Sequence, residues 1–347
     1  MKTEAFYRAF DANLNRAREG LRVLEDIARF VLEDATLADR ARTARHALKL
    51  PPDIEYGPIL EARSVPGDFG IKYSSEYYQG QVSVVIANAR RVQEAARVLE
   101  ETARILNLDS VEDFKRLRYT AYDLEQDFVQ KFRHVLKSSF LNNLKLYVIV
   151  GSEHTASRSV ADITREAIRG GAEMVQLREK NLPSKAFLET AQALREVTRN
   201  AGIPLIINDR ADIAAAAAAD GVHLGQDDLP VGAARRLLGE HAVIGVSTHS
   251  LSEAVDAEKD GADYIGFGPV FATPTKPDLE PLGTERLREV LQVVRVPVVA
   301  IGGIGPDNIG KVVAAGAQRV AVVSAVTGTP DVTANARLLH RILEGSR

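Results

Sequence analysis

The feature that most constrains the fold is a regular alternation of strand-like and helix-like runs from Asn143 onward. Eight short runs rich in β-branched residues each precede a run of helical periodicity. The strand-like runs are, in order, LKLYVIV, EMVQLR, IPLIIND, GVHLGQ, VIGVST, YIGFGPV, PVVAIGGI and RVAVVSAV. The helix-like runs lie near residues 159–170, 184–200, 211–219, 231–238, 251–259, 284–294, 307–315 and 331–344. Eight βα units of nearly equal length predict the α/β class and a (β/α)8 TIM barrel over residues 143–347. A doubly wound open sheet is the alternative, and the near-equal units favour closure.

The residues before this region predict a separate, all-α domain over residues 1–138. They are rich in Arg, Glu, Leu and Ala, and residues 11–34 and 111–136 carry helical periodicity. Within this half, residues 12–29 align without gaps on residues 87–104, and ten of the eighteen positions are identical. The identities include polar pairs that amphipathicity alone does not require, namely Asn13/Asn88, Arg16/Arg91, Glu19/Glu94, Arg22/Arg97, Glu25/Glu100 and Arg29/Arg104. Such an internal repeat predicts a duplicated helical hairpin.

The composition excludes several classes of binding partner and site. The net charge is −3, so the chain has no overall basic field that would attract nucleic acid or an anionic membrane. It has no cysteine, which excludes disulfides, thiolate metal sites and cysteine nucleophiles. Residues 1–20 lack the apolar core of a signal peptide, and no later stretch approaches the roughly 18 apolar residues of a membrane span. We therefore expect a cytoplasmic protein whose partners are small molecules, without nucleic acid or membrane.

Polar residues follow most of the predicted strands. The C-terminal ends of barrel strands meet at one mouth, where barrel enzymes carry their chemistry. Taken singly, each of these residues is more often part of a solvated loop, and their joint placement is what favours one site. In strand order they are Arg178 and Lys180; Asn208 and Asp209; Gln226, Asp227 and Asp228; Ser247, Thr248 and His249; Thr273, Thr275 and Lys276; Gly302 and Gly303; Val323 and Ser324.

The residue types at this mouth indicate phosphate chemistry with a divalent cation. Asp209 and Asp228, from adjacent strands, suit Mg²⁺, which takes a few oxygen ligands and bridges to substrate phosphates; Asp227 is a substitute ligand. Three cationic residues are expected at the mouth: Arg178, Lys180 and Lys276. A substrate with a single carboxylate does not need three cations, whereas a pyrophosphate does. After strand seven, IGGIGPDN places a glycine pair before Pro306, where we expect a helix to begin. This position predicts a second phosphate site on backbone N–H groups.

The second predicted strand, within EMVQLREKN, runs directly into charges. Because side chains alternate along a strand, Gln176, Arg178 and Lys180 should share the face that points to the substrate. Glu179 should then point away and pair with a neighbouring side chain. We expect its replacement to cost less activity than the loss of Lys180.

Seven motifs carry a resemblance to a known family. QLREK, NDR, GVHLGQDD, GVSTH, GFGPVFATPTK, IGGI and VVSA occur in this order and cover residues 143–345. The chain here resembles thiamine phosphate synthase. The resemblance implies a (β/α)8 barrel that joins 4-amino-2-methyl-5-hydroxymethylpyrimidine diphosphate to a thiazole phosphate, releases pyrophosphate and needs Mg²⁺. One departure is Asp227, where many members have Glu beside the metal ligand.

The resemblance also implies roles for single residues. The metal would lie on Asp209 and Asp228. The pyrimidine diphosphate would lie on Gln176, Leu177, Arg178, Glu179, Lys180, Asn208, Ser247 and Lys276. The thiazole phosphate would lie on Thr273, Pro274, Thr275, Gly303, Val323 and Ser324. Within these sets, the residues expected to act in catalysis are Arg178, Lys180, Ser247 and Lys276.

The chemistry of the implied substrate favours a dissociative path. Diphosphate leaves a benzylic-type carbon of an electron-rich aminopyrimidine, and the thiazole nitrogen then attacks the resulting cation. No nucleophile–base pair is evident in the sequence, and none is needed. The protein must stabilise the charge of the leaving group and align two substrates.

The helical half resembles a domain that is fused ahead of this synthase in some bacteria. The resemblance lies in NxxRxxExxRVLExxAR, in GDFGIKYSSEYYQG and in the second repeat copy, and it implies phosphorylation of hydroxymethylpyrimidine phosphate, with ATP as co-substrate. Residues 50–80, rich in Pro, Gly and Tyr, would form an ordered flap that closes over a phosphate with Arg63, Lys72, Ser74 and Ser75. No GxxxxGK[ST] loop is present. The alternative is that the repeated Arg and Glu residues form structural ion pairs between helices, or a dimerisation surface.

Two further alternatives concern the barrel. A non-catalytic or tautomerase-like barrel of the thiamine pathway should lack Asp209, Asp228 or Lys180, and all three are present. Another phosphosugar or indole-type barrel would need an acid–base pair at its strand ends.

We interpret His223 as a packed, hydrogen-bonded residue, and His249 as either a loop residue or the edge of the site. Carboxylation of the thiazole and formation of a homo-oligomer stay open.

Overall fold

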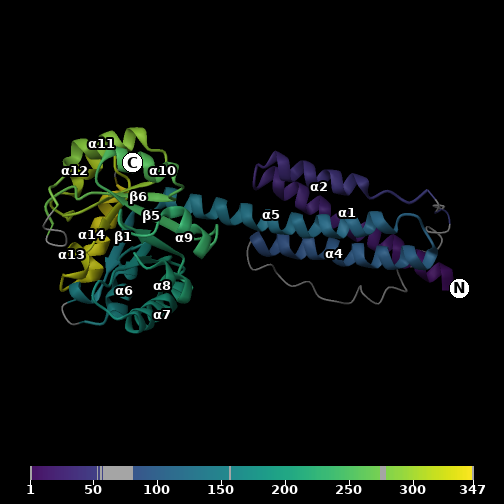
Figure 1. The fold of residues 1–347 in the computed structure, drawn as a ribbon, viewed down its shortest axis with the longest axis horizontal. Helices are drawn as coiled ribbons and strands as arrows, with labels where there is room; N and C mark the ends of the chain where they lie inside the picture. Colours follow the sequence, from purple (N-terminus) through teal and green to yellow (C-terminus); the bar gives the residue numbers. More distant parts are fainter. Residues whose placement is uncertain are drawn as a thin grey trace. The chain divides into compact units, whose positions relative to one another are not determined.

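The computed structural model describes residues 2–52, 54, 57, 81–155, 158–273 and 279–345. Contacts divide the chain into two compact units, Met1–Leu136 and Lys137–Arg347. Figure 1 shows helices in the first unit, and a barrel of strands with helices around it in the second. Most of the segment where we expected a flap lies outside the described residues, including Arg63, Lys72, Ser74 and Ser75.

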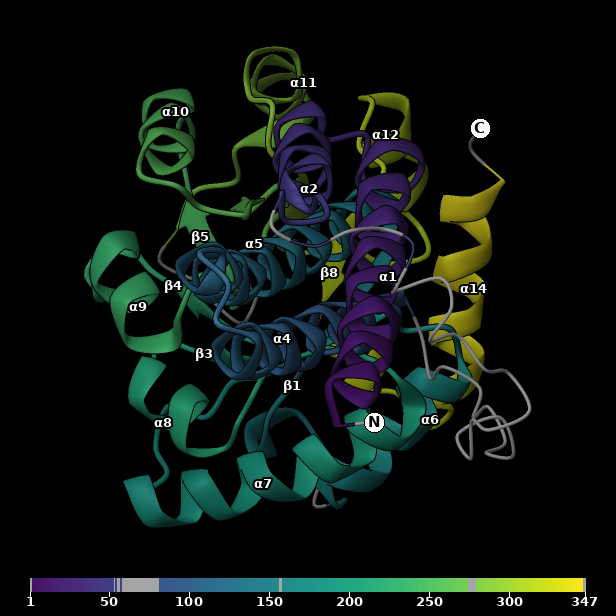
Figure 2. The ribbon, with the colours of Figure 1, turned by 90° about the vertical axis from the view of Figure 1, so that its right-hand side faces the viewer.

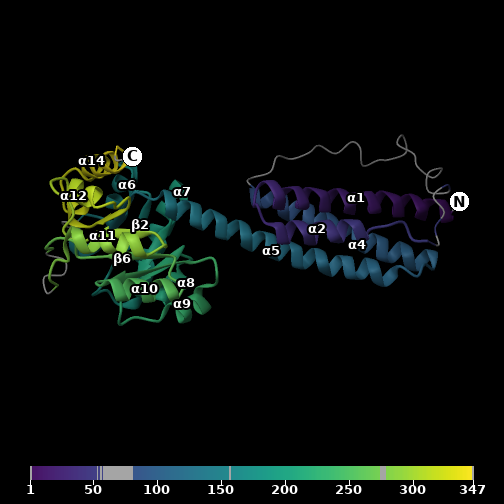
Figure 3. The same ribbon diagram turned by 90° about the horizontal axis from the view of Figure 1, so that it is seen from above.

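Long helices with apolar faces build the first unit. They are α1 (Lys2–Phe30), α2 (Ala35–Ala47), α4 (Gln81–Leu106) and α5 (Val111–Asn143), whose end belongs to the second unit. α1 packs against both α2 and α4, and Figures 1 and 3 show these helices side by side. Their apolar stripes meet in one core, whose buried members include Phe10, Leu21, Leu99, Leu124 and Phe128.

The two repeat copies lie on α1 and α4 and make equivalent contacts. Asn13 donates from Nδ2 to the carbonyl oxygen of Ala9 at 2.7 Å, and Asn88 donates to that of Val84 at 2.8 Å. Both amides therefore satisfy a backbone carbonyl of their own helix, four residues earlier.

A buried glutamate in each copy ties its helix to the next one. Glu25 is 3% exposed and accepts from Nε of Arg45, on α2, at 2.8 Å. Glu100 is 1% exposed and accepts from Nε of Arg118, on α5, at 3.3 Å. The α1–α2 pair thus resembles the α4–α5 pair in its ion pairing, and the duplicated helical hairpin stays a prediction. At both glutamates, the repeated charges form ion pairs between helices. This is the structural role that the sequence offers as the alternative to phosphate binding.

A closed barrel of eight parallel strands forms the second unit, in the order β1 to β8. The prediction of a barrel is confirmed, and the open sheet is wrong. The strands are β1 (Leu146–Val150), β2 (Met174–Leu177), β3 (Leu205–Asn208), β4 (Gly221–Leu224), β5 (Val243–Thr248), β6 (Tyr264–Phe267), β7 (Val298–Ile301) and β8 (Val320–Val322).

Helices surround the barrel, as Figure 2 shows. They are α6 (Val160–Arg169), α7 (Ser184–Ala201), α8 (Ala211–Ala216), α9 (Val231–Leu238), α10 (Leu251–Lys259), α11 (Gly283–Val293), α12 (Ile309–Ala314), α13 (Ser324–Thr327) and α14 (Val332–Glu344), with a short 3₁₀ helix at Ser152–His154. Within the described part of the chain, no helix is long and apolar enough to cross a membrane.

Two local predictions are wrong. Pro306 does not open a helix: it lies in a turn, and α12 begins at Ile309. Residues 324–326, which we placed in the last strand, belong to α13. The chain turns there because the carbonyl of Val323 accepts from the N–H groups of Val326 and Thr327, at 3.0 and 2.9 Å.

Alternation along the strands separates two layers of core. Inward side chains such as Tyr147, Met174 and Ile206 fill the barrel. Their outward neighbours, such as Val148 and Val175, pack under the helices. The strand ends are thus held by a packed scaffold on both faces.

Candidate active site

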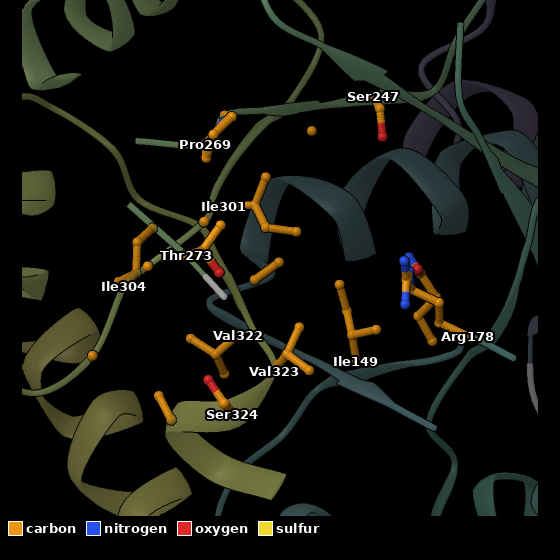
Figure 4. Close-up of a pocket in the computed structure, with 18 of the residues that line it drawn as sticks. Ile149, Arg178, Ser247, Pro269, Thr273, Ile301, Ile304, Val322, Val323 and Ser324 are labelled. Carbon is orange, nitrogen blue, oxygen red and sulfur yellow. The ribbon is translucent and has the colours of Figure 1, made fainter. Parts of the chain in front are cut away.

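The C-terminal ends of the strands surround a cavity of about 430 Å³. Figure 4 shows Arg178 on one side of it and Thr273 and Ser324 on the other. The structure thus brings together predicted substrate-binding residues from the ends of six strands, β2, β3 and β5 to β8, although their individual roles stay predictions. Those in the wall are Gln176, Arg178, Asn208, Ser247, Thr273, Gly303, Val323 and Ser324.

Other predicted substrate residues have side chains elsewhere. Leu177 is fully buried between the strands and the helices. Glu179 accepts from the backbone N–H and the hydroxyl of Ser152, at 2.8 and 2.7 Å. Any contact of these two residues with substrate would therefore come from their backbone. Three predicted residues lie outside the described residues: Pro274, Thr275 and Lys276.

The alternation predicted for the second strand is confirmed for Gln176, Arg178 and Glu179, whereas Lys180 does not line the cavity and pairs with Asp209. Gln176 and Arg178 line the cavity, while Glu179 points away to Ser152. The backbone N–H of Arg178 donates to Val150 at 2.8 Å, which continues the ladder with β1 beyond the end of β2. This bond fixes the guanidinium-bearing residue to the rigid barrel.

A chain of buried hydrogen bonds runs beneath the cavity and joins two of its wall residues. Gln176 donates from Nε2 to Oη of Tyr147 at 2.7 Å, and this phenol lies 3.0 Å from that of Tyr264. Nδ1 of His223 lies 2.9 Å from the Tyr264 hydroxyl, and its Nε2 lies 2.9 Å from Oγ of Ser247. The interpretation of His223 as packed and hydrogen-bonded is confirmed, but its pairing with a serine was not expected.

Burial keeps both phenols of this chain neutral. Desolvation raises the pKa of Tyr147 and that of Tyr264 far above the usual value for a tyrosine. Each neutral hydroxyl can donate one hydrogen bond and accept others. We did not select either tyrosine from the sequence, although both stand at inward strand positions.

Two carboxylates meet a lysine at the rim. Asp209 has φ +61°, a left-handed conformation that is uncommon outside glycine, and its N–H donates to the carbonyl of His223 at 2.8 Å. Its Oδ2 lies 2.5 Å from Nζ of Lys180. Burial raises the pKa of Asp228, and the neighbouring carboxylate of Asp209 raises it further, against the opposing effects of the Gly225 N–H and of Lys180.

Such a carboxylate pair is suited to a hard divalent cation. A cation between the two groups would relieve their repulsion, as Lys180 does in part. Among the described residues, no group of three or more His, Cys, Asp and Glu side chains is placed to hold a metal. Two carboxylate donors are compatible with Mg²⁺, which keeps several waters and binds through one or two carboxylates.

The segment after β7 forms a glycine-lined wall. Gly302 and Gly303 have φ +97° and +63°, and a Cβ on Gly303 would lie 2.3 Å from the carbonyl oxygen of Ala272. Asn308 accepts from the N–H of Gly305 and donates to the carbonyl of Gly303, both at 2.8 Å. We missed this role of Asn308, which fixes the loop that we predicted to hold a phosphate.

His249 lines the cavity, so of the two readings that we left open it belongs to the edge of the site. Its Nδ1 also lies 3.2 Å from Oε2 of Glu253 on α10. Gln226 donates to the carbonyl oxygen of Ser247 at 2.6 Å, which braces the end of β5.

Comparisons with known proteins identify the family of the chain. Residues 146–326 match the family model described as thiamine monophosphate synthase. A thiamine-phosphate synthase from Gloeobacter violaceus is 40% identical over 335 residues, which are 95% of this chain and 95% of the relative. The chain belongs to the thiamine-phosphate synthase family. A solved thiamine phosphate pyrophosphorylase from Pyrococcus furiosus shares 41% identity with this family member at a TM-score of 0.55, covering 59% of this chain and 98% of that one.

The relatives also differ in how much of this chain they match. The synthase from Chloroflexus aurantiacus is 52% identical over 200 residues, which are 57% of this chain but 92% of that protein. Residues 8–127 of this chain match a second family model, described as the ThiD2 family. This synthase-family member therefore carries a helical unit that is not shared by all of its relatives.

Proposed function

We propose that the barrel unit is a transferase that joins an aminopyrimidine diphosphate to a thiazole phosphate, giving thiamine phosphate and pyrophosphate. Family membership supports this reaction. The observation that supports the reaction most strongly is the set of charges at the rim. There, Lys180 and the Asp209–Asp228 pair adjoin a cavity whose wall contains Arg178. A tautomerase-like barrel would have no use for this combination of charges.

Asp209 and Asp228 would hold Mg²⁺ in the active enzyme. The ion would supply charge neutralisation for the departing diphosphate. Binding there would also release Lys180 from Asp209, so that its ammonium could bind the same anion. Arg178, which directly follows β2, would contact the diphosphate from inside the cavity, and Lys276 would add a third cation.

The second substrate would bind on the opposite wall. The hydroxyls of Thr273 and Ser324 lie there (Figure 4), close to the loop that contains Gly303. We assign the phosphate of the thiazole to this wall, together with Val323 and the predicted contacts at Pro274 and Thr275. The protein would then hold the thiazole nitrogen in line with the reacting methylene, so that binding supplies orientation.

The Ser247–His223 pair raises a second possible path, covalent catalysis by the serine. Attack of Oγ on the methylene would form an ether, whose alkoxide leaves far less readily than diphosphate. The other nitrogen of His223 lies 2.9 Å from the hydroxyl of Tyr264, at the position where serine hydrolases place a carboxylate on the imidazole. We therefore assign Ser247 to substrate binding and His223 to its positioning.

A metal titration tests the assignment at the rim. Wild-type protein should release pyrophosphate only when both substrates and Mg²⁺ are present, and a chelator should abolish the release. Asp209→Asn should need much more Mg²⁺ or lose turnover. Wild-type turnover with an unchanged Mg²⁺ dependence in Asp209→Asn would exclude this metal site.

For the helical unit we propose, as a separate function, phosphorylation of the pyrimidine monophosphate with ATP. The match to a second family model supports a distinct activity. Incubating the full chain with the monophosphate and ATP should give the diphosphate, and no product under conditions where the barrel is active would exclude the kinase. We further propose the cytoplasm as the compartment and a homo-oligomer as the assembly.

A further inference from the structure

The helical unit contains its own cavity of about 470 Å³, between α1 and α2. Its volume falls within the range of small-molecule sites. Charged side chains dominate its wall, and four guanidiniums face two carboxylates: Arg22, Arg29, Arg42 and Arg45 against Glu25 and Asp39. The wall thus carries a surplus of two positive charges before any contribution from His46, which also lines it.

Structural ion pairs use only part of this positive charge. Arg45 binds the buried Glu25, and Arg22 pairs with Asp26 at 3.1 Å. Arg29 lies over the ring of Phe30, with Cζ 4.8 Å from its centroid. Among the residues that the structure describes, neither Arg29 nor Arg42 belongs to an ion pair. Two exposed guanidiniums therefore point into the cavity wall without an acidic partner.

The second repeat copy shows what the same scaffold does when its charges are only structural. Arg104, the equivalent of Arg29, pairs with both Glu100 and Glu101, at 2.5 and 3.0 Å. Arg97 pairs with the same two glutamates. Burial of Glu100 would raise its pKa, but these guanidiniums and that of Arg118 outweigh it and lower the pKa. In the second copy, each of these guanidiniums therefore has an acidic partner.

The first copy leaves the equivalent partner unsatisfied. Asp26 stands at the position of Glu101, and its Oδ1 is buried without a hydrogen-bond partner among the described residues. Arg29 could satisfy this oxygen as Arg104 does in the other copy, and it does not. The repeated segments share the buried glutamate and the arginines at the positions of Arg22 and Arg29, but the shorter Asp26 replaces Glu101 in the first copy. The first copy thus differs from the second in leaving Arg29 outside an ion pair among the described residues.

We propose that the cavity between α1 and α2 is a binding site for a small phosphomonoester, with Arg29 and Arg42 as the residues that bind its phosphate. Two guanidinium forks match the charge and the oxygens of one phosphate dianion. The remaining volume accommodates an organic group of small-molecule size. Glu25 and Arg45 hold the wall together and leave the two free arginines to the ligand.

Arginine labelling tests the site directly in the full chain. Phenylglyoxal modifies exposed guanidiniums, and peptide mass spectrometry reads each arginine separately. Arg116 on α5, whose side chain is 77% exposed and which pairs with Asp113 at 3.7 Å, is the internal control. Because labelling reports occupancy without turnover, the result does not depend on the kinase proposal, nor on phosphate bound in the barrel.

Inorganic phosphate and glycerol 3-phosphate are the probes, with chloride at equal ionic strength as control. At ten times its Kd, a probe should slow labelling of Arg29 and Arg42 about tenfold and leave Arg116 unchanged. In Arg42→Gln, protection of Arg29 should fall, while Arg116→Gln should leave it intact. No protection, or equal slowing at Arg116, would overturn the proposal. Protection by ATP at far lower concentration than by either probe would also overturn it, in favour of a nucleotide site.

Discussion

His223 holds the hydroxyl of Ser247 in the wall of the cavity, with Nε2 2.9 Å from Oγ. Its other nitrogen is fixed by Tyr264, which is bonded in turn to Tyr147. Three buried residues therefore determine the direction in which one substrate-contacting hydroxyl points, and the same chain ends at Gln176. The barrel interior thus sets the geometry of two wall residues on different strands.

Breaking this chain away from the cavity should lower activity without removing a substrate contact. Tyr264→Phe removes the hydroxyl that bonds Nδ1 of His223, so we expect a loss of about 1–3 kcal/mol in the free energy of unfolding. We also expect kcat to fall while KM for the thiazole phosphate stays near its wild-type value. Urea unfolding and steady-state kinetics measure both, with the exposed Tyr119→Phe as control. Unchanged kcat would contradict the positioning role.

Ser247 should act without a covalent intermediate. Intact-protein mass spectrometry during turnover should show no adduct, and Ser247→Ala should lose activity through weaker binding and misalignment of substrate, by about 10²-fold or more. An adduct of pyrimidine mass on the Ser247 peptide, absent in Ser247→Ala, would instead establish covalent catalysis.

The two charged neighbours at the end of β2 should differ sharply. Lys180→Ala removes a cation from the rim, and we expect kcat/KM to fall on the order of 10²-fold or more, because charge on the leaving group is left unbalanced. Glu179→Gln should cost less than about tenfold, since its carboxylate contacts Ser152 and points away from the cavity. Equal losses in the two variants would refute the assigned directions.

The glycine wall offers a matched pair of substitutions. Gly303→Ala combines a left-handed φ with a 2.3 Å approach to Ala272 O, so the loop must shift. We expect KM for the thiazole phosphate to rise about tenfold or more. Gly310→Ala, in α12, has no atom within 4 Å of the added Cβ and should leave KM unchanged. A normal KM in Gly303→Ala would show that this loop does not hold the phosphate.

Glu100 should make the helical unit sensitive to acid. Its pKa is lowered in the folded protein from the ordinary value of 4.5, although burial acts in the opposite direction, because Arg104, Arg118 and Arg97 favour the carboxylate. The stability that this pairing provides is present above pH 4.5 and is lost as the pH falls through the lower, folded pKa. Thermal unfolding of Glu100→Gln should show a deficit at pH 7 that shrinks below pH 4.5. A deficit that is constant with pH would exclude this linkage.

Features that depend on local periodicity could be predicted from the sequence. The alternation that places Gln176 and Glu179 on opposite faces follows from strand geometry alone. By contrast, the contact between Tyr147 and Tyr264 depends on how the barrel closes, because these residues are 117 positions apart. The role of Asn308 depends on the path of a glycine loop. The different pairing of the equivalent Arg29 and Arg104 depends on side-chain packing, which the repeat does not encode.

The most direct test of the account is product formation by the full chain from the aminopyrimidine diphosphate and the thiazole phosphate, with Mg²⁺ and without ATP. Thiamine phosphate and pyrophosphate should appear in equal amounts, and omission of the thiazole phosphate should prevent formation of thiamine phosphate. Absence of thiamine phosphate in the presence of both substrates and Mg²⁺ would contradict the account.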